Sequence, residues 1–230
     1  LIVGLALSLP VTAWLVRLGR RLRTLDSAGA VGHDKQLRAI PNIGGIAIFL
    51  AVVAPMAIGL IAIHLIGAET WHSLLPAFEP HLPRVRQTAP TAWVLLGAVT
   101  ALHVVGVLDD RRSLPPLPKL IVQVAAAAVL AIWFDVRLFT LVGPTLSILL
   151  TVAWIVAITN AINFLDNMDG LAGGVAAIAG TLFMIAALIN HQWFIAATLA
   201  LLVGALVGFL IFNFPPARIF MGDGGSLVIG

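Results

Sequence analysis

Long apolar runs, separated by short charged segments, are the feature that most constrains this chain. Hydrophobic residues make up 60% of the sequence and charged residues only 10%, whereas soluble domains average roughly 45–50% apolar and about 25% charged residues. A helix of about 20 apolar residues spans the hydrocarbon core of a bilayer. The sequence therefore predicts an all-α fold, a polytopic transmembrane helical bundle, with seven spans at Leu1–Val16, Ile43–Ile66, Thr91–Leu108, Leu120–Phe134, Thr145–Leu165, Leu171–Ile189 and Phe194–Phe212.

The composition does not change along the chain, so we expect one integral-membrane domain over residues 1–230. The segment from Gly225 to Gly230 looks like the start of another helix, and we interpret the chain as truncated at its C-terminus. The longest connection between spans, from Gly67 to Pro90, is predicted to be a plain loop. Cysteine is absent, which excludes disulfides, zinc–thiolate sites and thiol catalysis.

Basic residues set the orientation, because Lys and Arg in short loops favour the cytoplasmic side. With the N-terminus outside, only Arg84, Arg86 and Arg137 lie outside, and ten of the 13 basic residues lie in inner segments: Arg17, Arg20, Arg21, Arg23, Lys35, Arg38, Arg111, Arg112, Lys119 and Arg218. This orientation also places five acidic residues on the cytoplasmic face, although they were not used to choose it: Asp109, Asp110, Asp166, Asp169 and Asp223. We therefore expect one cytoplasmic site assembled from three loops.

The segment TNAINFLDNMDGLAGG, residues 159–174, ends one of the spans. Four polar residues recur in it at every third position: Asn160, Asn163, Asp166 and Asp169. On a helix the first three of these would share one broad face. Asn167 and Gly170 favour helix ends and turns, because short polar side chains compete for backbone hydrogen bonds and Gly tolerates positive φ. We expect this span to end in a turn that presents carboxylates and amides at the membrane surface.

A second polar segment, HVVGVLDDRRSLPPLPKLIVQ, covers residues 103–123. A helix is predicted to end at Asp109 and Asp110, followed by a Pro-containing loop before Lys119 opens the next span. Adjacent residues on a helix do not share a face. One aspartate is therefore expected to face the site while the other is held by Arg111, Arg112 or Lys119. A solvated charge cluster that only caps the span is the alternative.

A third polar segment, FPPARIFMGDGGS, covers residues 214–226. Two prolines end the preceding helix, and glycines then flank Asp223 with backbone that can approach a ligand closely. Asn and Asp side chains offer hard oxygen ligands, and the chain holds no thiolate. Mg²⁺ is the expected ion, with Mn²⁺ as the substitute.

Two features inside the spans are interpreted as structural. Small-residue pairs of the Gly-x-x-x-Gly type predict close helix packing in lipid, and they occur at Gly170/Gly174 and Gly204/Gly208. An ionisable group inside a span is a functional candidate by default. For His64 and His103 we favour the other interpretation, in which a neutral imidazole hydrogen-bonds within the bundle.

The order of these motifs resembles that of a known family. PNIGG at Pro41–Gly45, the LDD…LPPLPK run, NAINFLDNMDGLAGG and PPARIFMGDGGS are together similar to the polyprenyl-phosphate N-acetylhexosamine-1-phosphate transferases. These integral membrane enzymes include phospho-N-acetylmuramoyl-pentapeptide transferase and the UDP-N-acetylglucosamine–undecaprenyl-phosphate transferases that start teichoic acid, O-antigen and related polymers. DNMDGLAGG is closer to the N-acetylglucosamine branch. The family's cytosolic His-containing motif is missing from this chain.

The resemblance implies a role for each polar residue of these motifs. Asp223 and Asn163 correspond to positions associated with Mg²⁺. The implied catalytic residues are Asp109 and Asp110, near the lipid phosphate, and Asp166 and Asp169, near the nucleotide and metal. Lys35 is an alternative to Arg38 among the implied substrate-binding residues, which are Asn160, Asn163, Arg38, Lys119, Arg111, Arg112, Arg218 and Gly222.

The resemblance also implies a reaction: a UDP-N-acetylhexosamine, preferably UDP-N-acetylglucosamine, and polyprenyl phosphate give a polyprenyl-diphospho-sugar and UMP. The site would lie on the cytoplasmic face of the bacterial inner membrane, at the first membrane step of cell-envelope polysaccharide synthesis. The expected partners are the UDP-sugar, the polyprenyl phosphate, the bilayer and a second copy in a homodimer, with no nucleic acid. The alternatives are phospho-N-acetylmuramoyl-pentapeptide transfer, an anion transporter and a non-catalytic membrane scaffold.

Overall fold

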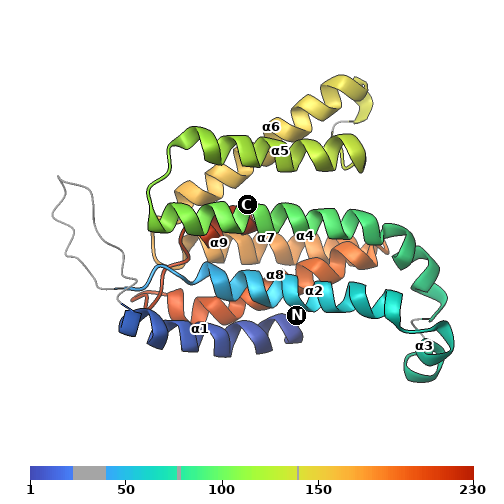
Figure 1. The fold of residues 1–230 in the computed structure, drawn as a ribbon, viewed down its shortest axis with the longest axis horizontal. Helices are drawn as coiled ribbons and strands as arrows, with labels where there is room; N and C mark the ends of the chain where they lie inside the picture. Colours follow the sequence, from blue (N-terminus) through green and yellow to red (C-terminus); the bar gives the residue numbers. More distant parts are fainter. Residues whose placement is uncertain (23–39, 77–78, 139) are drawn as a thin grey trace.

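The computed structural model of the 230-residue chain describes residues 1–22, 40–76, 79–138 and 140–230. Arg38 and Lys35, both candidate phosphate-binding residues, lie outside the described residues. Two 3₁₀ turns, η1 (Glu79–His81) and η2 (Thr140–Val142), lie between helices. The described helices are α1 (Ile2–Leu22), α2 (Gly45–Leu65), α3 (Ala68–Leu74), α4 (Leu82–Arg111), α5 (Pro116–Trp133), α6 (Pro144–Leu165), α7 (Leu171–Ile189), α8 (Trp193–Asn213) and α9 (Asp223–Ile229) (Figure 1).

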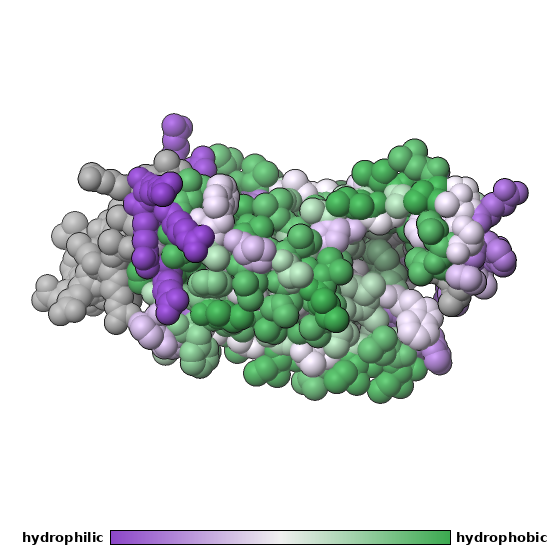
Figure 2. Space-filling model, turned by 90° about the horizontal axis from the view of Figure 1, so that it is seen from below, coloured by the Kyte–Doolittle hydropathy of each residue, from purple (hydrophilic) through white to green (hydrophobic). Residues whose placement is uncertain are grey.

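Seven of the described helices are long and apolar enough to cross a membrane: α1, α2, α4, α5, α6, α7 and α8. They correspond one by one to the seven predicted spans, so the prediction of an all-α polytopic membrane protein is confirmed. Figure 2 shows the hydropathy pattern that this requires, with apolar side chains over the middle of the molecule and hydrophilic side chains gathered at its two ends.

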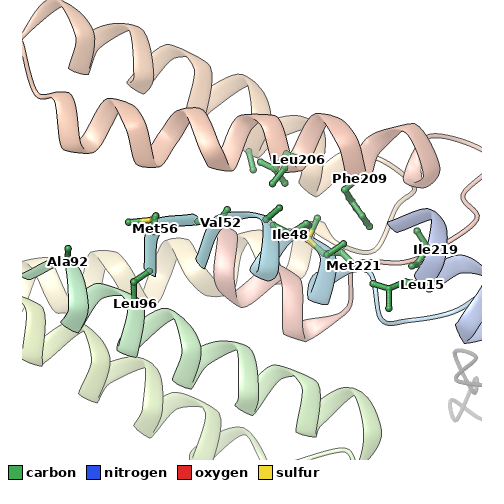
Figure 3. Close-up of a cluster of buried hydrophobic side chains, with 14 of the residues drawn as sticks. Leu15, Ile48, Val52, Met56, Ala92, Leu96, Leu206, Phe209, Ile219 and Met221 are labelled. Atoms are coloured by element: carbon green, nitrogen blue, oxygen red, sulfur yellow. The ribbon is translucent and has the colours of Figure 1, made fainter. Parts of the chain in front are cut away.

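The core lies where α2 packs between α8 and α4 (Figure 3). Ile48 of α2 is fully buried, as are Leu206 and Phe209 of α8, and the side chains of Ala92 and Leu96 approach from α4. Two residues that precede α9, Ile219 and Met221, close the end of this cluster. The core therefore continues to the chain segment that carries Asp223.

Helix α8 packs closely against α1 through its glycines. A Cβ at Gly204 would collide with the Leu1 carbonyl group, and one at Gly208 would lie 3.1 Å from the Leu9 nitrogen. The predicted close packing at Gly204/Gly208 is confirmed. The predicted close packing is wrong for Gly174, since a Cβ there would meet no atom within 4 Å. The neighbouring Gly173 faces α8 instead.

Helices α5 and α6 lie along one edge of the bundle (Figure 1). In the most apolar stretch of each, 17% of the residues are buried, compared with 39% in both α2 and α8. Large apolar side chains on α6 remain exposed, including Leu149 at 62% and Phe164 at 76%. Such a surface suits contact with lipid, where apolar side chains need no burial.

The predicted plain loop between Gly67 and Pro90 is wrong in part. It contains α3 and η1, and α4 already begins at Leu82. Pro83 stands in the first turn of α4, where the missing N–H would have had no helical partner. Pro90 lies inside the helix, so it does not mark the start of the span. The helix predicted from Gly225 is confirmed as α9 (Asp223–Ile229), which begins two residues earlier than expected.

Candidate active site

Lys119 joins two aspartates that are far apart in the sequence. Its Nζ lies 2.6 Å from Asp109 Oδ2 and 2.5 Å from Asp223 Oδ2. Asp109 also accepts a hydrogen bond of 2.6 Å from the Leu114 amide, which closes the loop between α4 and α5. The prediction that one aspartate of the pair is held by a neighbouring cation is confirmed, and the cation is Lys119.

Asp110, the second aspartate of the pair, binds the start of α9. Its carboxylate oxygens accept hydrogen bonds from the backbone amides of Asp223, at 2.8 Å, and Gly224, at 3.0 Å, and from Asn42 Nδ2, at 3.2 Å. These amides would otherwise lack partners, since the first amides of a helix have none within it. Asp110 therefore fixes the backbone that carries Asp223.

The segment Pro41–Gly45 runs beside the segment that leads into α9. The Phe220 amide donates to the Pro41 carbonyl at 2.8 Å, and the Gly44 amide donates to the Phe220 carbonyl at 2.9 Å. Gly222 has φ +69°, and a Cβ there would lie 2.6 Å from Asp110 Oδ2. Only glycine suits this position, because it needs both a positive φ and space for a carboxylate.

His103 and Gly106 bring α4 against α9. His103 Nδ1 donates to the Gly224 carbonyl at 2.7 Å, and its ring stacks on Phe49 with centroids 4.1 Å apart. A Cβ at Gly106 would collide with the Asp223 backbone. The interpretation of His103 as a structural group is confirmed by this geometry.

The end of α6 supplies the opposite wall of the site. Asn163 Nδ2 donates to Asp223 Oδ1 at 2.8 Å and to Ser226 Oγ at 2.7 Å. Asn160, one turn earlier, donates instead to Gln123 Oε1 of α5 at 2.6 Å. Asn163 therefore contacts the carboxylate cluster directly, whereas Asn160 lies behind it.

Helix α6 ends at Leu165, so the predicted polar face is shorter than the spacing suggested. Asp166 is the C-cap residue, and Asp169 lies in the turn before α7, where its Oδ2 accepts a hydrogen bond of 2.9 Å from the Ala217 amide. Gly170 follows with φ +74°, a value that favours glycine. The predicted turn of carboxylates and amides is confirmed.

Four carboxylates influence one another at this end of the bundle: Asp109, Asp110, Asp166 and Asp223. Burial raises the pKa of Asp166 to about 7, and the negative charges of Asp110 and Asp223 add to the rise. Burial also raises the pKa of Asp223, together with the nearby carboxyl group of Asp109, while Lys119 and Asn163 act in the opposite direction. Closely spaced carboxylates of this kind favour a bound cation.

The remaining predicted cations do not take part in this cluster. Arg111, Arg112 and Arg218 are exposed, and within the described ranges no ion pair involves them. They lie at the ends of helices or in loops at the same end of the bundle as the aspartates, where Figure 2 shows hydrophilic side chains. Their side chains are available to a ligand that arrives from the aqueous side.

Sequence reasoning missed four polar residues that organise the site: Asn42, Gln123, Asn213 and Ser226. Asn213 Oδ1 accepts a hydrogen bond of 3.1 Å from the Gly170 amide, and its Nδ2 donates one of 2.9 Å to the Ile219 carbonyl. Gln123 is only 2% exposed. A polar residue inside an apolar run, as Gln123 and Asn213 are, was the signal available in the sequence. Asn42 and Ser226 carried no such signal, because both stand in short Gly-rich stretches of the sequence.

The donor set fits Mg²⁺. Asp166, Asp223 and Asn163 carry oxygen atoms at this end of the bundle, and such oxygens are the hard ligands that Mg²⁺ prefers. No set of three or more His, Asp or Glu side chains within the described ranges is arranged to hold a metal ion by itself. Mg²⁺ commonly takes only one or two carboxylates and completes its shell with substrate phosphates and water, so this set suits an ion that binds together with a phosphate ligand.

The fold and the site together describe a polytopic helical membrane protein with a carboxylate–lysine cluster at one end of the bundle. Residues 92–230 match the model of glycosyl transferase family 4, and the chain belongs to this family. It is 33% identical to a Bacillus subtilis protein named probable undecaprenyl-phosphate N-acetylglucosaminyl 1-phosphate transferase, over 100% of this chain and 59% of that protein. It is 35% identical to the decaprenyl-phosphate N-acetylglucosaminephosphotransferase of Mycobacterium tuberculosis, over 88% of this chain and 51% of that protein.

Relatives of a second type are nearly as similar. The chain is 30% identical to the phospho-N-acetylmuramoyl-pentapeptide-transferase of Lactobacillus gasseri, over 96% of this chain and 68% of that protein. It thus spans about half the length of the N-acetylglucosamine-type relatives and two thirds of this one. The resemblance of the sequence motifs to the family is confirmed.

Proposed function

We propose that this chain is part of an enzyme that transfers N-acetylglucosamine-1-phosphate from UDP-N-acetylglucosamine to polyprenyl phosphate and releases UMP. The observation that carries the proposal is the contact of Lys119 with both Asp109 and Asp223, inside the part of the chain that matches the family. It brings residues from α4, α5 and α9 together at one end of a membrane bundle, where a lipid phosphate and a soluble nucleotide can meet.

The choice of sugar rests on the relatives and on one motif. Relatives named for N-acetylglucosamine transfer reach 33–35% identity, and DNMDGLAGG at residues 166–174 is closer to that branch. Relatives named for phospho-N-acetylmuramoyl-pentapeptide transfer are 30% identical over 96% of the chain and 38% identical over 60% of it. Identity alone therefore does not select the sugar, and this activity is the second candidate. A donor panel that contains both UDP-sugars distinguishes the two.

Charge neutralisation is the main task of the residues at this site. Both reactants are anions, and two unit charges about 4 Å apart repel by roughly 4 kcal/mol at an effective dielectric near 20. Lys119 reduces this repulsion from within the cluster, and Arg111, Arg112 and Arg218 do so from the aqueous side. Asp223, helped by Asn163 and Asp166, would hold Mg²⁺, which supplies stabilisation of negative charge on the transferred phosphoryl group.

The paired aspartates act by positioning. A phosphate monoester has a second pKa near 6 and is largely dianionic at pH 7, so its attack needs little base catalysis. The carboxylate of Asp110 already accepts hydrogen bonds from backbone amides of α9. That of Asp109 accepts hydrogen bonds from Lys119 and from the Leu114 amide. Asp110 therefore holds Asp223 in place, and Asp109 orients Lys119 toward the phosphates.

Asp169 and its surroundings suit the nucleotide end of the donor. A hollow of about 470 Å³ is lined by Met168, Asp169, Pro215 and Pro216. It lies beside the turn that Asp169 and Ala217 hold together. The position of the carboxylates at helix ends also argues against a transporter, whose substrate site is expected near the bilayer midplane.

The direct test measures UMP release by the full-length protein in detergent. Polyprenyl phosphate is supplied with UDP-N-acetylglucosamine, UDP-N-acetylmuramoyl-pentapeptide or UDP-glucose, each with and without Mg²⁺. We expect UMP only with Mg²⁺ and with UDP-N-acetylglucosamine as the preferred donor. A transporter or a scaffold would release no UMP with any donor, because neither cleaves the diphosphate of the UDP-sugar.

Replacing Asp223 by Asn tests the metal assignment. The variant loses the negative charge and keeps only one of the two oxygens that Lys119 and Asn163 contact, so we expect UMP release to fall on the order of 10³-fold. The fold is expected to persist, because Asp110 still binds the backbone amides of α9. Normal folding with undiminished UMP release would refute the role of Asp223.

A further inference from the structure

The contact between Gln123 and Asn160 lies one helical turn deeper in the bundle than the site. Asn160 Nδ2 donates both to Gln123 Oε1, at 2.6 Å, and to the Val156 carbonyl, at 2.8 Å. The Val156 carbonyl can only accept a hydrogen bond, so the nitrogen of Asn160 must face it. The oxygen of Gln123 therefore faces Asn160, and the buried Gln123 Nε2 has no hydrogen-bond partner among the described residues.

This contact stands directly behind two residues that hold Asp223. Gln123 follows Lys119 by four residues on α5, and Asn160 precedes Asn163 by three residues on α6, so each pair shares one helix face. Lys119 contacts Asp223 Oδ2 and Asn163 contacts Asp223 Oδ1. The Gln123–Asn160 bond thus joins the same two helices, on the same faces, that meet Asp223 one turn further along.

The Gln123–Asn160 bond is a directional polar contact within the interface between α5 and α6. Only 17% of the residues in the most apolar stretch of each helix are buried, because much of each helix faces away from the bundle, while the two helices contact each other about as extensively as α2 and α8 do. A buried donor without a partner is unfavourable, so the bond with its unpaired Nε2 adds little to stability. What it supplies is a fixed register between α5 and α6.

We infer that Gln123 is a positioning residue, which with Asn160 sets the register of α5 against α6 so that Lys119 and Asn163 reach the two oxygens of Asp223. For its effect on activity the inference rests on the proposed transferase function. Neither Gln123 nor Asn160 touches Asp223 in the described hydrogen bonds. Both act through the neighbouring turn of their helix.

The kinetic test replaces Gln123 by Met, which keeps the size of the side chain and removes the acceptor. We expect kcat for UMP release to fall about 10-fold, KM for the UDP-sugar to stay within twofold, and the thermal unfolding temperature to stay unchanged or rise. The exchange Gln123→Asn with Asn160→Gln keeps donor, acceptor and the number of methylene groups, and it should restore most of kcat. An unchanged kcat in Gln123→Met would overturn the inference.

Ser147→Ala is the matched control. Ser147 is also buried in α6, and its Oγ donates to the Leu138 carbonyl at 2.6 Å, at the end of the α5–α6 pair away from the aspartates. We expect its kcat to match that of the unmodified protein. An equal loss of kcat in Ser147→Ala would mean that any loosening of this helix pair lowers activity, and the specific role of Gln123 would be rejected.

A distance measurement tests the positioning without any activity. The chain contains no cysteine, so a spin-label pair can be placed at Leu117→Cys and Phe164→Cys, which are 64% and 76% exposed. We expect Gln123→Met to broaden or shift the distance distribution in electron paramagnetic resonance, and Ser147→Ala to leave it unchanged. An identical distribution in Gln123→Met rejects the inference, whereas absence of UMP release by the unmodified protein rejects only the proposed function.

Discussion

The α1–α2–α8 part of the bundle and the α5–α6 pair are held in place by different means. Helices α2 and α8 are packed tightly, with glycines and small apolar residues at their contacts. The α5–α6 pair buries fewer than half as many residues per span; α5 packs on α4 and α6 on α9, and Lys119 and Asn163 add polar contacts to Asp223. Dispersion between closely packed small residues drives helix association in lipid, so the first region does not depend on the site whereas the second does.

This difference predicts two separate classes of variant. Substitutions in the α1–α2–α8 region should lower stability while the molecules that stay folded keep their activity. Substitutions in the polar contacts of α5 and α6 should lower activity with little change in stability. A substitution in the α1–α2–α8 region that lowers the activity of folded molecules, or one in the polar contacts of α5 and α6 that strongly lowers stability, would contradict this division. It would show that the two regions are coupled more strongly than their contacts indicate.

Among the substitutions that test this comparison of the two regions, Lys119→Met is expected to have the largest effect. It removes the only cation among the described residues that contacts both Asp109 and Asp223, and we expect UMP release to fall on the order of 10²–10³-fold. Lys119→Arg, which keeps the charge but not the compact ammonium, should recover part of the activity. The unfolding temperature in detergent should fall by far less than in the core variant described next.

Leu206→Ala should have the second largest effect, on stability. Leu206 is fully buried between α8 and α2 (Figure 3), and loss of its contacts should lower the free energy of unfolding by roughly 2–4 kcal/mol. Thermal unfolding measures this loss, and UMP release per folded molecule should remain within about twofold. A large drop in activity without loss of stability would contradict the separation of the two regions.

The smallest effect, and the sharpest comparison, comes from two glycines in spans. Gly204→Ala places a methyl group against the α1 backbone, whereas Gly174→Ala places it in open space. We expect Gly204→Ala to destabilise the protein by about 1–3 kcal/mol and Gly174→Ala to be neutral or stabilising by up to about 1 kcal/mol. Equal unfolding temperatures for the two variants would show that the α1–α8 contact does not support the fold.

The spans and the polar motifs could be predicted from the sequence, because both depend on local properties. Run length and apolarity decide which helices can cross a bilayer, and that physical requirement holds wherever a helix packs. The turn after α6 followed from Asn, Asp and Gly preferences, whereas the start of α9 at Asp223, inside a Gly-rich stretch, did not. The early start of α4 could not be predicted in this way, since Pro83 and Pro90 appeared to exclude a helix that in fact accommodates both.

The partners of each polar side chain depended on the tertiary structure. The sequence left Lys119, Arg111 and Arg112 as equal candidates for the aspartate pair, and only the approach of α5 to α9 selected Lys119. It placed Asn160 with Asn163 on one face, but the position of α5 gave Asn160 a buried partner in Gln123.

The sequence by itself determined that this chain is a membrane helix bundle with acidic motifs at one end, because hydropathy and turn preferences act over a few residues. Only the tertiary structure decided which of those acids meet, because a hydrogen bond of about 3 Å between residues more than a hundred positions apart depends on how every intervening helix packs.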